Sequence, residues 1–251
     1  MVSKNDIKRI KQLEQKKYRQ REGLFVAEGP KVVGDLLRCG YQPTILFATS
    51  EWNDKSAFFD TKHSGNQLRT EIITNEELQK LSFLQHPQQV LAVFPIPQQS
   101  FPEPKGLCLA LDGVQDPVNL GTIIRIADWF GIKNIYCSTD SADAWNPKVI
   151  QATMGSIARV NIYYCDLSVI LCQTTLPVYG TLLDGNDLYQ EELSTEGIIV
   201  MGNEGNGISQ PIRKLINKKL LIPSYSHDDT AESLNVAIAT AITCAEFRRR
   251  K

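Results

Sequence analysis

The sequence lacks the features that mark several large classes of protein. No apolar run approaches the roughly 18–20 residues needed to cross a bilayer. The amino terminus is charged and has no apolar stretch of the kind found in signal peptides. The 251 residues, of which 42% are hydrophobic, suit one large or two small globular domains. We therefore expect a cytoplasmic protein that has no membrane partner.

Ligand sets for metals and disulfides are also missing. The six cysteines are scattered without a C-x-x-C pair, and several lie within apolar strand patterns. The three histidines, His63, His86 and His227, are far apart in the sequence, and none shows the spacing of metal ligands. This pattern predicts reduced core thiols, no disulfide framework and no metal site.

Two common nucleotide-binding motifs are absent as well. No G-K-[ST] motif occurs, and no G-x-G-x-x-G follows the strand expected at 107–114. A P-loop and a classical dinucleotide-binding fold are therefore disfavoured. The sequence also contains no internal repeat and no low-complexity segment.

Positive charge is concentrated near the amino terminus. The net charge is only −1, but residues 4–21 contain eight Lys or Arg and two acidic residues, a local charge of +6. The rest of the chain therefore carries about −7. A basic segment of this kind is either an arm that binds a polyanion or an ordinary solvated helix.

The first part of the chain alternates between helical and strand patterns. A basic helix is expected over 3–21, and Asn75 is placed to cap a later one. Four prolines within 95–106 predict a semi-rigid linker. We place the domain limits at 1–94, 95–105 and 106–251, and we expect the first domain to be a small α/β sandwich. Its expected strands cover 24–29, 44–49, 70–74 and 88–96, and its other helices cover 30–40 and 75–82.

The second part alternates more regularly and predicts a parallel sheet with helices on both faces. Asn119 is expected to cap the first helix, and Ser233 or Thr230 the last. A stripe at helical spacing in the last helix is expected to face the core: Leu234, Ile238, Ala241, Ile242 and Ala245. The expected strands cover 107–114, 134–139, 159–165, 177–185, 197–205 and 218–224, and the helices 119–131, 146–158, 166–175, 211–217 and about 230–250.

Two loops at expected strand ends are candidates for a ligand site. One is the glycine-rich loop 202–207, and the other leads from Ile222 and Pro223 into the last helix. Open α/β sheets bind ligands at such strand ends. Glu204 is a single carboxylate among glycines, which is not a pattern that serves packing. Arg125, in the first helix of this part, either covers apolar surface with its stem or directs its guanidinium at an anion.

Three segments, taken together and in order, resemble the signature motifs of the SpoU (TrmH) family of RNA ribose 2′-O-methyltransferases. They are DGVQDPVNLGTIIR (112–125), VMGNEGNGI (200–208), and Ile222-Pro223 followed by SLNVAIA (233–239). The segment KKYRQREGLFVAEGPK (16–31) resembles the family's amino-terminal substrate-binding domain, whose fold is shared with ribosomal RNA-binding proteins.

This resemblance implies a fold and partners that periodicity alone does not propose. The second domain is expected to be an α/β knot that binds S-adenosylmethionine (AdoMet) and forms a homodimer, with the active site completed across the interface. The substrate is expected to be structured RNA, either rRNA or tRNA. Cofactor contacts are expected largely from the backbone, at Thr181, Gly202, Ile222 and Leu234. RNA contacts are expected at Lys16, Lys17, Arg19, Arg21 and Glu28.

The resemblance also implies a catalytic set. Its members are Arg125, Asn119, Glu204, Ser233 and Asn235. In similar enzymes the arginine is proposed to act with a substrate phosphate to remove the 2′-proton. Because arginine is not normally deprotonated, we expect Arg125 to stabilise phosphate and the developing alkoxide instead. Glu204 is expected to orient Arg125 or to cap the backbone turn, and Ser233 and Asn235 to hold the loop and the ribose.

One departure from the family pattern stands beside the motifs. The segment 224–232 is longer than usual and acidic, with Asp228 and Asp229 next to His227. Three interpretations of this segment are open. It alters substrate choice, it places His227 to assist proton transfer, or it is only a solvated loop. Two other functions remain open: a catalytically silent RNA-binding or ribosome-assembly factor, and a different small-molecule enzyme on a similar fold. The complete polar set favours the methyltransferase over the silent protein.

Overall fold

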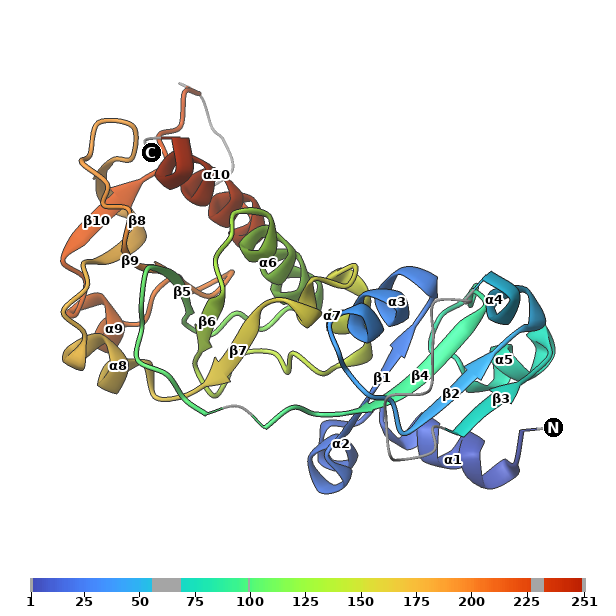
Figure 1. Cartoon of the computed structure of the whole chain (residues 1–251). Coiled ribbons are helices and arrows are strands. Elements are labelled where there is room, and N and C mark those ends of the chain that lie inside the picture. Colours follow the sequence, from blue (N-terminus) through green and yellow to red (C-terminus); the bar gives the residue numbers. More distant parts are fainter. Residues whose placement is uncertain (1, 56–68, 99, 227–232, 250–251) are drawn as a thin grey trace. The chain divides into compact units, whose positions relative to one another are not determined.

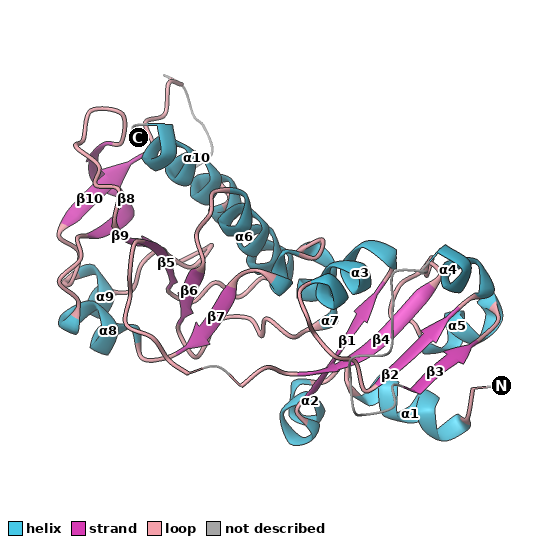
Figure 2. Ribbon diagram, in the orientation of Figure 1, coloured by secondary structure: helices cyan, strands magenta, loops and turns pink. Residues whose placement is uncertain are grey.

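The computed structural model in Figures 1 and 2 describes residues 2–55, 69–98, 100–226 and 233–249. The chain divides into two compact units, and both are discontinuous in sequence. Unit 1 comprises residues 1–98 and 143–158, and unit 2 comprises 99–142 and 159–251. The predicted limits assigned residues 143–158 to the second domain, because that domain was expected to be the continuous segment 106–251. In the structure the segment packs with the first unit.

Unit 1 contains a four-stranded sheet in the order β1-β4-β2-β3. Strand β4 is antiparallel to both of its neighbours, whereas β2 and β3 are parallel. The strands are β1 (Leu24–Glu28), β2 (Ile45–Ala48), β3 (Arg69–Ile72) and β4 (Val90–Pro95). The helices are α1 (Lys4–Gln12), α2 (Lys16–Glu22), α3 (Pro30–Arg38), α4 (Ser50–Lys55), α5 (Asn75–Leu81) and α7 (Pro147–Ala152), followed by the short 3₁₀ helix η2 (Ser156–Ala158).

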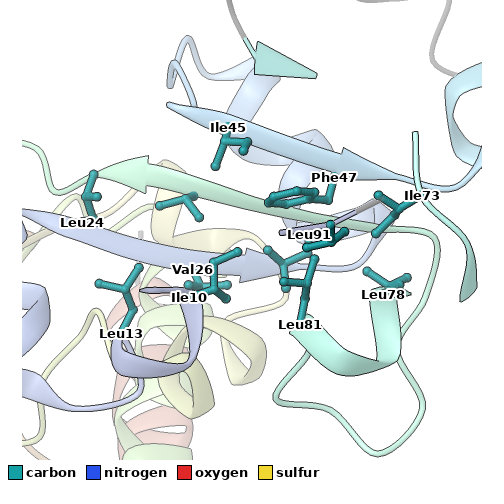
Figure 3. Close-up of a cluster of buried hydrophobic side chains, with 12 residues drawn as sticks. Ile10, Leu13, Leu24, Val26, Ile45, Phe47, Ile73, Leu78, Leu81 and Leu91 are labelled. Atoms are coloured by element: carbon teal, nitrogen blue, oxygen red, sulfur yellow. The ribbon is translucent and has the colours of Figure 1, made fainter. Parts of the chain in front are cut away.

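Alternate residues of the strands cover the two faces of this sheet. One face packs against α1 and α5, where the two helices contribute Ile10, Leu13, Leu78 and Leu81 to a buried cluster (Figure 3). On the opposite face Phe25 stacks on Phe94 with ring centroids 5.6 Å apart. Strands β1 and β2 are continuously buried because both faces of the sheet are covered.

Segment 143–158 packs on the second of these faces. The ring of Trp145 lies 4.7 Å from that of Phe25. Arg19 contributes a buried ion pair, because its Nε donates to Oδ2 of Asp143 at 3.0 Å and its Nη2 donates to the same oxygen. Nη1 of Arg19 donates to the carbonyl oxygens of Leu13 and Glu14 at 2.8 and 2.7 Å. Arg19 thus ties the chain between α1 and α2 to Asp143.

The structure corrects the expectation that Arg19 contacts RNA. Arg19 is 1% exposed. Among the described residues, its guanidinium donates hydrogen bonds to Leu13, Glu14 and Asp143. The single helix expected over 3–21 is also interrupted, since α1 ends at Gln12 and α2 begins at Lys16. The break frees the carbonyl groups that Arg19 binds. The basic stretch around Arg19 gave no signal that one of its arginines would be buried.

We expect replacement of Arg19 with leucine to lower the free energy of unfolding by about 3 kcal/mol. The change leaves the Asp143 carboxylate, whose side chain is 14% exposed, without its cation. Urea unfolding followed by tryptophan fluorescence measures the loss. The matched control is Arg21→Leu, because Arg21 is a surface residue of the same helix whose side chain is 64% exposed. This control is expected to lower the free energy of unfolding by less than about 1 kcal/mol. Equal losses in the two variants would contradict the buried ion pair of Arg19 and Asp143.

Unit 2 contains a six-stranded parallel sheet in the order β10-β8-β9-β5-β6-β7. The predicted parallel sheet with helices on both faces is therefore confirmed. The strands are β5 (Leu107–Leu111), β6 (Asn134–Cys137), β7 (Asn161–Tyr164), β8 (Val178–Asp187), β9 (Gly197–Met201) and β10 (Lys218–Leu221). The helices are α6 (Pro117–Trp129), α8 (Leu167–Gln173), α9 (Gln210–Arg213) and α10 (Val236–Arg249).

Strand β8 leaves its ladder for several residues. Lys219 of β10 lies opposite Gly180, but the next residue, Leu220, lies opposite Asn186. Residues 181–185 are therefore looped out of the sheet, and we call them the β8 bulge. A Cβ atom on Gly185 would lie 2.6 Å from the carbonyl carbon of Leu220, so the bulge rejoins the sheet at a point where only glycine fits.

Helices α6 and α10 lie side by side on one face of this sheet (Figure 1), whereas α8 and α9 pack on the cluster at the other face. The face of α10 that packs in the structure differs from the face that the sequence predicted. The stripe of α10 expected to face the core is largely on the surface, with Ile238 52% exposed and Leu234 before it 49% exposed. Small residues are buried instead, including Ala237, Thr240 and Cys244.

The buried threonines of α10 explain why the apolar pattern misled. Thr240 and Thr243 donate their hydroxyl groups to the carbonyl oxygens of Val236 and Ala239, at 2.7 and 2.8 Å. Their polar atoms are therefore satisfied within the helix, and their small side chains permit close packing. Larger apolar residues of α10, such as Ile238, therefore lie on its exposed face.

The described residues contain no disulfide, and the six cysteines are free. Cys108, Cys137 and Cys244 are buried, as predicted, but Cys39 and Cys172 are exposed. Burial raises the pKa of the Cys244 thiol to about 12. Among the described helices, none is both long enough and apolar enough to cross a membrane.

Candidate active site

A cleft of about 510 Å³ lies in unit 2, where the β8 bulge, the loop after β9 and the start of α10 meet. All four residues expected to contact a cofactor line it: Thr181, Gly202, Ile222 and Leu234. Glu204 and Ser233, from the expected catalytic set, line it too. The apolar part of the lining includes Leu182, Leu183, Met201, Ile208, Leu220 and Val236.

The glycine-rich loop after β9 is held in a fixed shape. Asn203 and Gly207 exchange two backbone hydrogen bonds, of 2.9 and 3.0 Å. The side-chain oxygen of Asn203 accepts from the amides of Gly205 and Asn206, each at 3.0 Å. A Cβ atom on Gly202 would lie 2.6 Å from the carbonyl oxygen of Gly207 and would also overlap that residue's carbonyl carbon. The loop therefore folds back directly onto the end of β9.

A chain of hydrogen bonds joins three loops beside the cleft. Asn119, in the first turn of α6, donates from Nδ2 to Oε1 of Glu204 at 3.0 Å. Oδ1 of Asn119 accepts from Nδ2 of Asn235 at 3.0 Å. These three polar residues were predicted to act together, and the structure brings them into direct contact although they lie far apart in sequence.

Glu204 also caps the turn that precedes α6. Its carboxylate accepts from the amide of Gln115 at 3.3 Å and from that of Asp116 at 3.2 Å. Partial burial tends to raise the pKa of Glu204, but the hydrogen bonds from Asn119 and from the backbone amides outweigh it, and the pKa is lowered. The carboxylate is therefore ionised at neutral pH. Of the two expected roles, Glu204 caps the backbone, and no hydrogen bond joins it to Arg125 among the described residues.

Three helix caps differ from the sequence predictions. In unit 1, Thr74 rather than Asn75 caps α5. Helix α6 begins two residues before Asn119, and Asp116 is its cap, accepting from the amide of Asn119 at 2.8 Å. This arrangement frees the Asn119 side chain for the neighbouring loops. At α10 the cap is Asn235, whose Oδ1 accepts from the amide of Ala237 at 2.9 Å, rather than Ser233. Thr230, the other expected cap, lies outside the described residues.

Arg125 is set apart from the rest of the expected catalytic set. It is an exposed residue of α6 and does not line the cleft. Within the described part of the chain its guanidinium makes no hydrogen bond or ion pair. Val118 and Trp129, which share its side of the helix at helical spacing, are 55% and 85% exposed. Arg125 is therefore a cation without a partner among the described residues, on a helix face that also exposes Val118 and Trp129.

Sequence reasoning did not single out several residues that shape the site. Asn203 donates from Nδ2 to the carbonyl oxygen of Gly113 at 2.7 Å and so joins the loops after β9 and β5. Asp112, at the end of β5, accepts from the amide of Ser209 at 2.7 Å. Asn203 and Asp112 each follow a buried strand, and this position in the sequence could have identified them as candidate site residues. No sequence pattern identified Asp184 in the β8 bulge or Arg213 in α9, although both line the cleft.

The residues expected to contact RNA in unit 1 have two different environments. Lys16, Lys17 and Arg21 are exposed on α2. Lys17 and Arg21 each lie 4.9 Å from the centre of the Tyr18 ring, which makes a basic and aromatic surface.

Glu28 lies in the interior and does not fit the expected role in RNA contact. It is 6% exposed and accepts hydrogen bonds from the Ser82 hydroxyl and from the amide of Phe83. Burial raises the pKa of its carboxyl group, against the effect of these hydrogen bonds. We therefore read Glu28 as a residue that fixes the start of the loop after α5.

No group of three or more His, Cys, Asp or Glu side chains is arranged to hold a metal ion within the described ranges. Most of the acidic segment 224–232, including His227, Asp228 and Asp229, lies outside them. Its role is therefore still a prediction.

Comparisons with known proteins cover both units. Residues 106–245 match the model of the SpoU rRNA Methylase family, and residues 4–92 match the MRM3-like substrate binding domain. The chain is 30% identical to the 23S rRNA (guanosine(2553)-2′-O)-methyltransferase RlmP of Bacillus subtilis, over 96% of this chain and 95% of that protein.

Two solved structures are similar over the whole chain. A TrmH-family protein from Porphyromonas gingivalis has a TM-score of 0.90 at 41% identity, and the match covers 100% of both chains. An AdoMet-bound rRNA methyltransferase from Sinorhizobium meliloti has a TM-score of 0.85 at 29% identity, covering 100% of this chain and 97% of that one.

Proposed function

The chain belongs to the SpoU rRNA methylase family, and from this membership we propose that it transfers a methyl group from AdoMet to a ribose 2′-hydroxyl of ribosomal RNA. It is an AdoMet-dependent RNA methyltransferase whose catalytic unit has the α/β-knot fold of its relatives. The observation that supports the proposal most strongly is the chain Glu204–Asn119–Asn235, because it joins the three signature segments at the edge of one cleft.

The cleft has the character expected of a site for AdoMet. Its volume of about 510 Å³ is within the range of small-molecule sites, and its lining combines apolar side chains with polar and charged ones. The loop returns so closely onto Gly202 that this position, which lines the cleft, has no room for a side chain. We propose that Thr181, Gly202, Ile222 and Leu234 hold the cofactor, whose sulfonium supplies the methyl group.

The polar residues at the edge of the cleft are proposed to position the ribose. A 2′-hydroxyl is a weak nucleophile, and no His or Cys is among the described residues of the cleft lining. Alignment and electrostatic stabilisation therefore have to supply much of the rate. The side-chain amides of Asn119 and Asn235 are joined by a hydrogen bond, and Ser233, which lines the cleft, is proposed to contribute its hydroxyl. Arg125 is proposed to bind the substrate phosphate and the developing alkoxide.

The RNA is proposed to bind unit 1 through the exposed face of α2. Lys16, Lys17 and Arg21 provide charge for phosphates, and Tyr18 provides a ring on which a base can stack. This assignment keeps three of the five residues that the family resemblance implied.

The exposed apolar surface of α6 and α10 supports a homodimer. Trp129, Val118, Leu234 and Ile238 are each about half exposed or more, and the two helices are adjacent. Exposed apolar patches on paired helices are typical of interfaces. Because Arg125 shares this surface, we propose that a second copy covers it and completes the active site around Arg125.

We expect Ile238→Glu to convert the dimer into a monomer and to reduce activity with it, because a charge would be buried in the interface. Sedimentation velocity measures the oligomeric state. Val169→Glu is the matched control, since Val169 is a 48% exposed aliphatic residue on α8, away from this surface. A variant Ile238→Glu that remains dimeric, or a wild-type protein that is monomeric, would disprove the proposed interface.

The function is tested by incubating the protein with labelled AdoMet and rRNA and mapping the modified nucleotide. We expect methyl incorporation at a ribose 2′-oxygen, and loss of one 2′-O-methyl mark in total RNA from a deletion strain. RNA binding without methyl transfer would support the silent ribosome-assembly factor instead. Failure to bind AdoMet in calorimetry would exclude the methyltransferase.

A further inference from the structure

The charged groups of the cleft are distributed unevenly along its lining. Among the described residues that line it, Arg213 is the only cation, and Asp184 and Glu204 are the acids. Glu204 is already occupied by Asn119 and by the turn before α6. Arg213 lies at the end of α9, and Asp184 lies in the β8 bulge, so this pair belongs to a different part of the wall.

Asp184 is shared between two cations. Its Oδ2 accepts from Nη2 of Arg213 and from Nζ of Lys219, the latter at 3.0 Å. One carboxylate between two cations leaves a net charge of +1. Lys219 is not part of the cleft lining, whereas Arg213 is, so the surplus charge is available to the cleft through Arg213. Hydrogen bonds from Lys219 and Arg213 lower the pKa of Asp184, which is therefore ionised at neutral pH.

The guanidinium of Arg213 retains donors for a ligand. Its side chain is 31% exposed, and within the described chain only Nη2 is hydrogen bonded. A guanidinium has five N–H donors, and its planar fork matches a carboxylate in bidentate geometry. Because Asp184 fixes one nitrogen, the remaining donors are held in a limited range of directions.

AdoMet carries one anionic group, the α-carboxylate of its methionine part. We propose that Arg213 binds this carboxylate and that Asp184 orients Arg213 for the purpose. The inference rests on the proposed function, since it assigns a residue to the cofactor of that reaction. An RNA phosphate is the competing anion, but Arg213 lines the same cleft as Thr181, Gly202, Ile222 and Leu234, which are proposed to hold the cofactor.

Calorimetry with two ligands separates these roles. Wild-type protein is titrated with AdoMet and with decarboxylated AdoMet, which lacks only the group in question. We expect wild-type protein to bind AdoMet about 10–100-fold more tightly, the range for a charge-assisted hydrogen-bonded pair. Arg213→Gln is expected to lose this preference and to bind decarboxylated AdoMet as wild type does. Arg213→Lys, which keeps the charge but not the fork, is expected to retain part of the preference.

Lys214→Gln is the matched control, because it removes an exposed positive charge next to Arg213 that does not line the cleft. It is expected to keep AdoMet affinity within about twofold of wild type. An equal loss for both ligands in Arg213→Gln, or an unchanged preference, overturns the inference, and a loss of rRNA affinity alone assigns Arg213 to phosphate. If wild-type protein binds neither ligand, the proposed function itself has failed. Thermal melting of each variant shows that it is folded.

Discussion

Replacing Arg125 with alanine is expected to reduce methyl transfer by roughly 10²–10³-fold, the range for loss of one group that stabilises developing charge. The folded protein should hardly change. Arg125 is an exposed residue of α6 without a hydrogen bond in the described part of the chain, and alanine is the strongest helix former. The free energy of unfolding is therefore expected to stay within about 0.5 kcal/mol of wild type.

Single-turnover methylation of rRNA at saturating AdoMet measures this effect, with AdoMet affinity determined separately by calorimetry. Because Arg125 does not line the cleft, AdoMet affinity should be unchanged. Lys133→Ala removes an exposed positive charge elsewhere in unit 2 and should leave the rate unchanged. Full activity of Arg125→Ala would show that the guanidinium has no part in the reaction.

Replacing Gly202 with alanine is expected to weaken AdoMet binding by more than about 100-fold. The added methyl group would collide with the backbone of Gly207 and Ile208, which is not free to move as a side chain would be. The loop 203–207 would have to separate from the end of β9, and the wall of the cleft would move with it. A displacement of this kind alters every backbone contact on that side.

Gly205→Ala provides the control within the same loop. A Cβ atom there would meet nothing closer than Oδ1 of Asn203, at 3.7 Å, which is ordinary contact. We expect Gly205→Ala to bind AdoMet within about threefold of wild type. Calorimetry on both variants tests the comparison, and similar affinities for the two would mean that the close return at Gly202 is not needed for the cleft.

The sequence predicted the location of the site because its loops follow buried strands. The sequence singled out the loop 202–207, where hydrogen bonds now connect the segments after β5 and β9, but the strand expected over 107–114 ends at Leu111. The contacts themselves could not be predicted. The freedom of the Asn119 side chain depends on the start of α6 at Pro117, and an asparagine two residues into a helix looks like a cap in sequence.

Burial on helices was harder to predict than strand position. Apolar periodicity assigned the wrong face of α10 to the core, because threonines that bond within the helix occupy the packed face. The burial of Arg19 depends on Asp143, a residue more than one hundred positions away. Neither outcome is encoded in local composition, since each depends on which side chain a distant segment presents.

The inclusion of segment 143–158 in unit 1 limits how such proteins can recombine. A gene fragment that ends in the linker would encode a first unit in which Phe25 lacks Trp145 and Arg19 lacks its carboxylate. An exchange of the first unit between relatives would therefore remove these contacts unless residues 143–158 were exchanged as well. We expect the first unit to lose stability when it is separated from residues 143–158, although the proline-rich linker gives the two parts the look of separable modules.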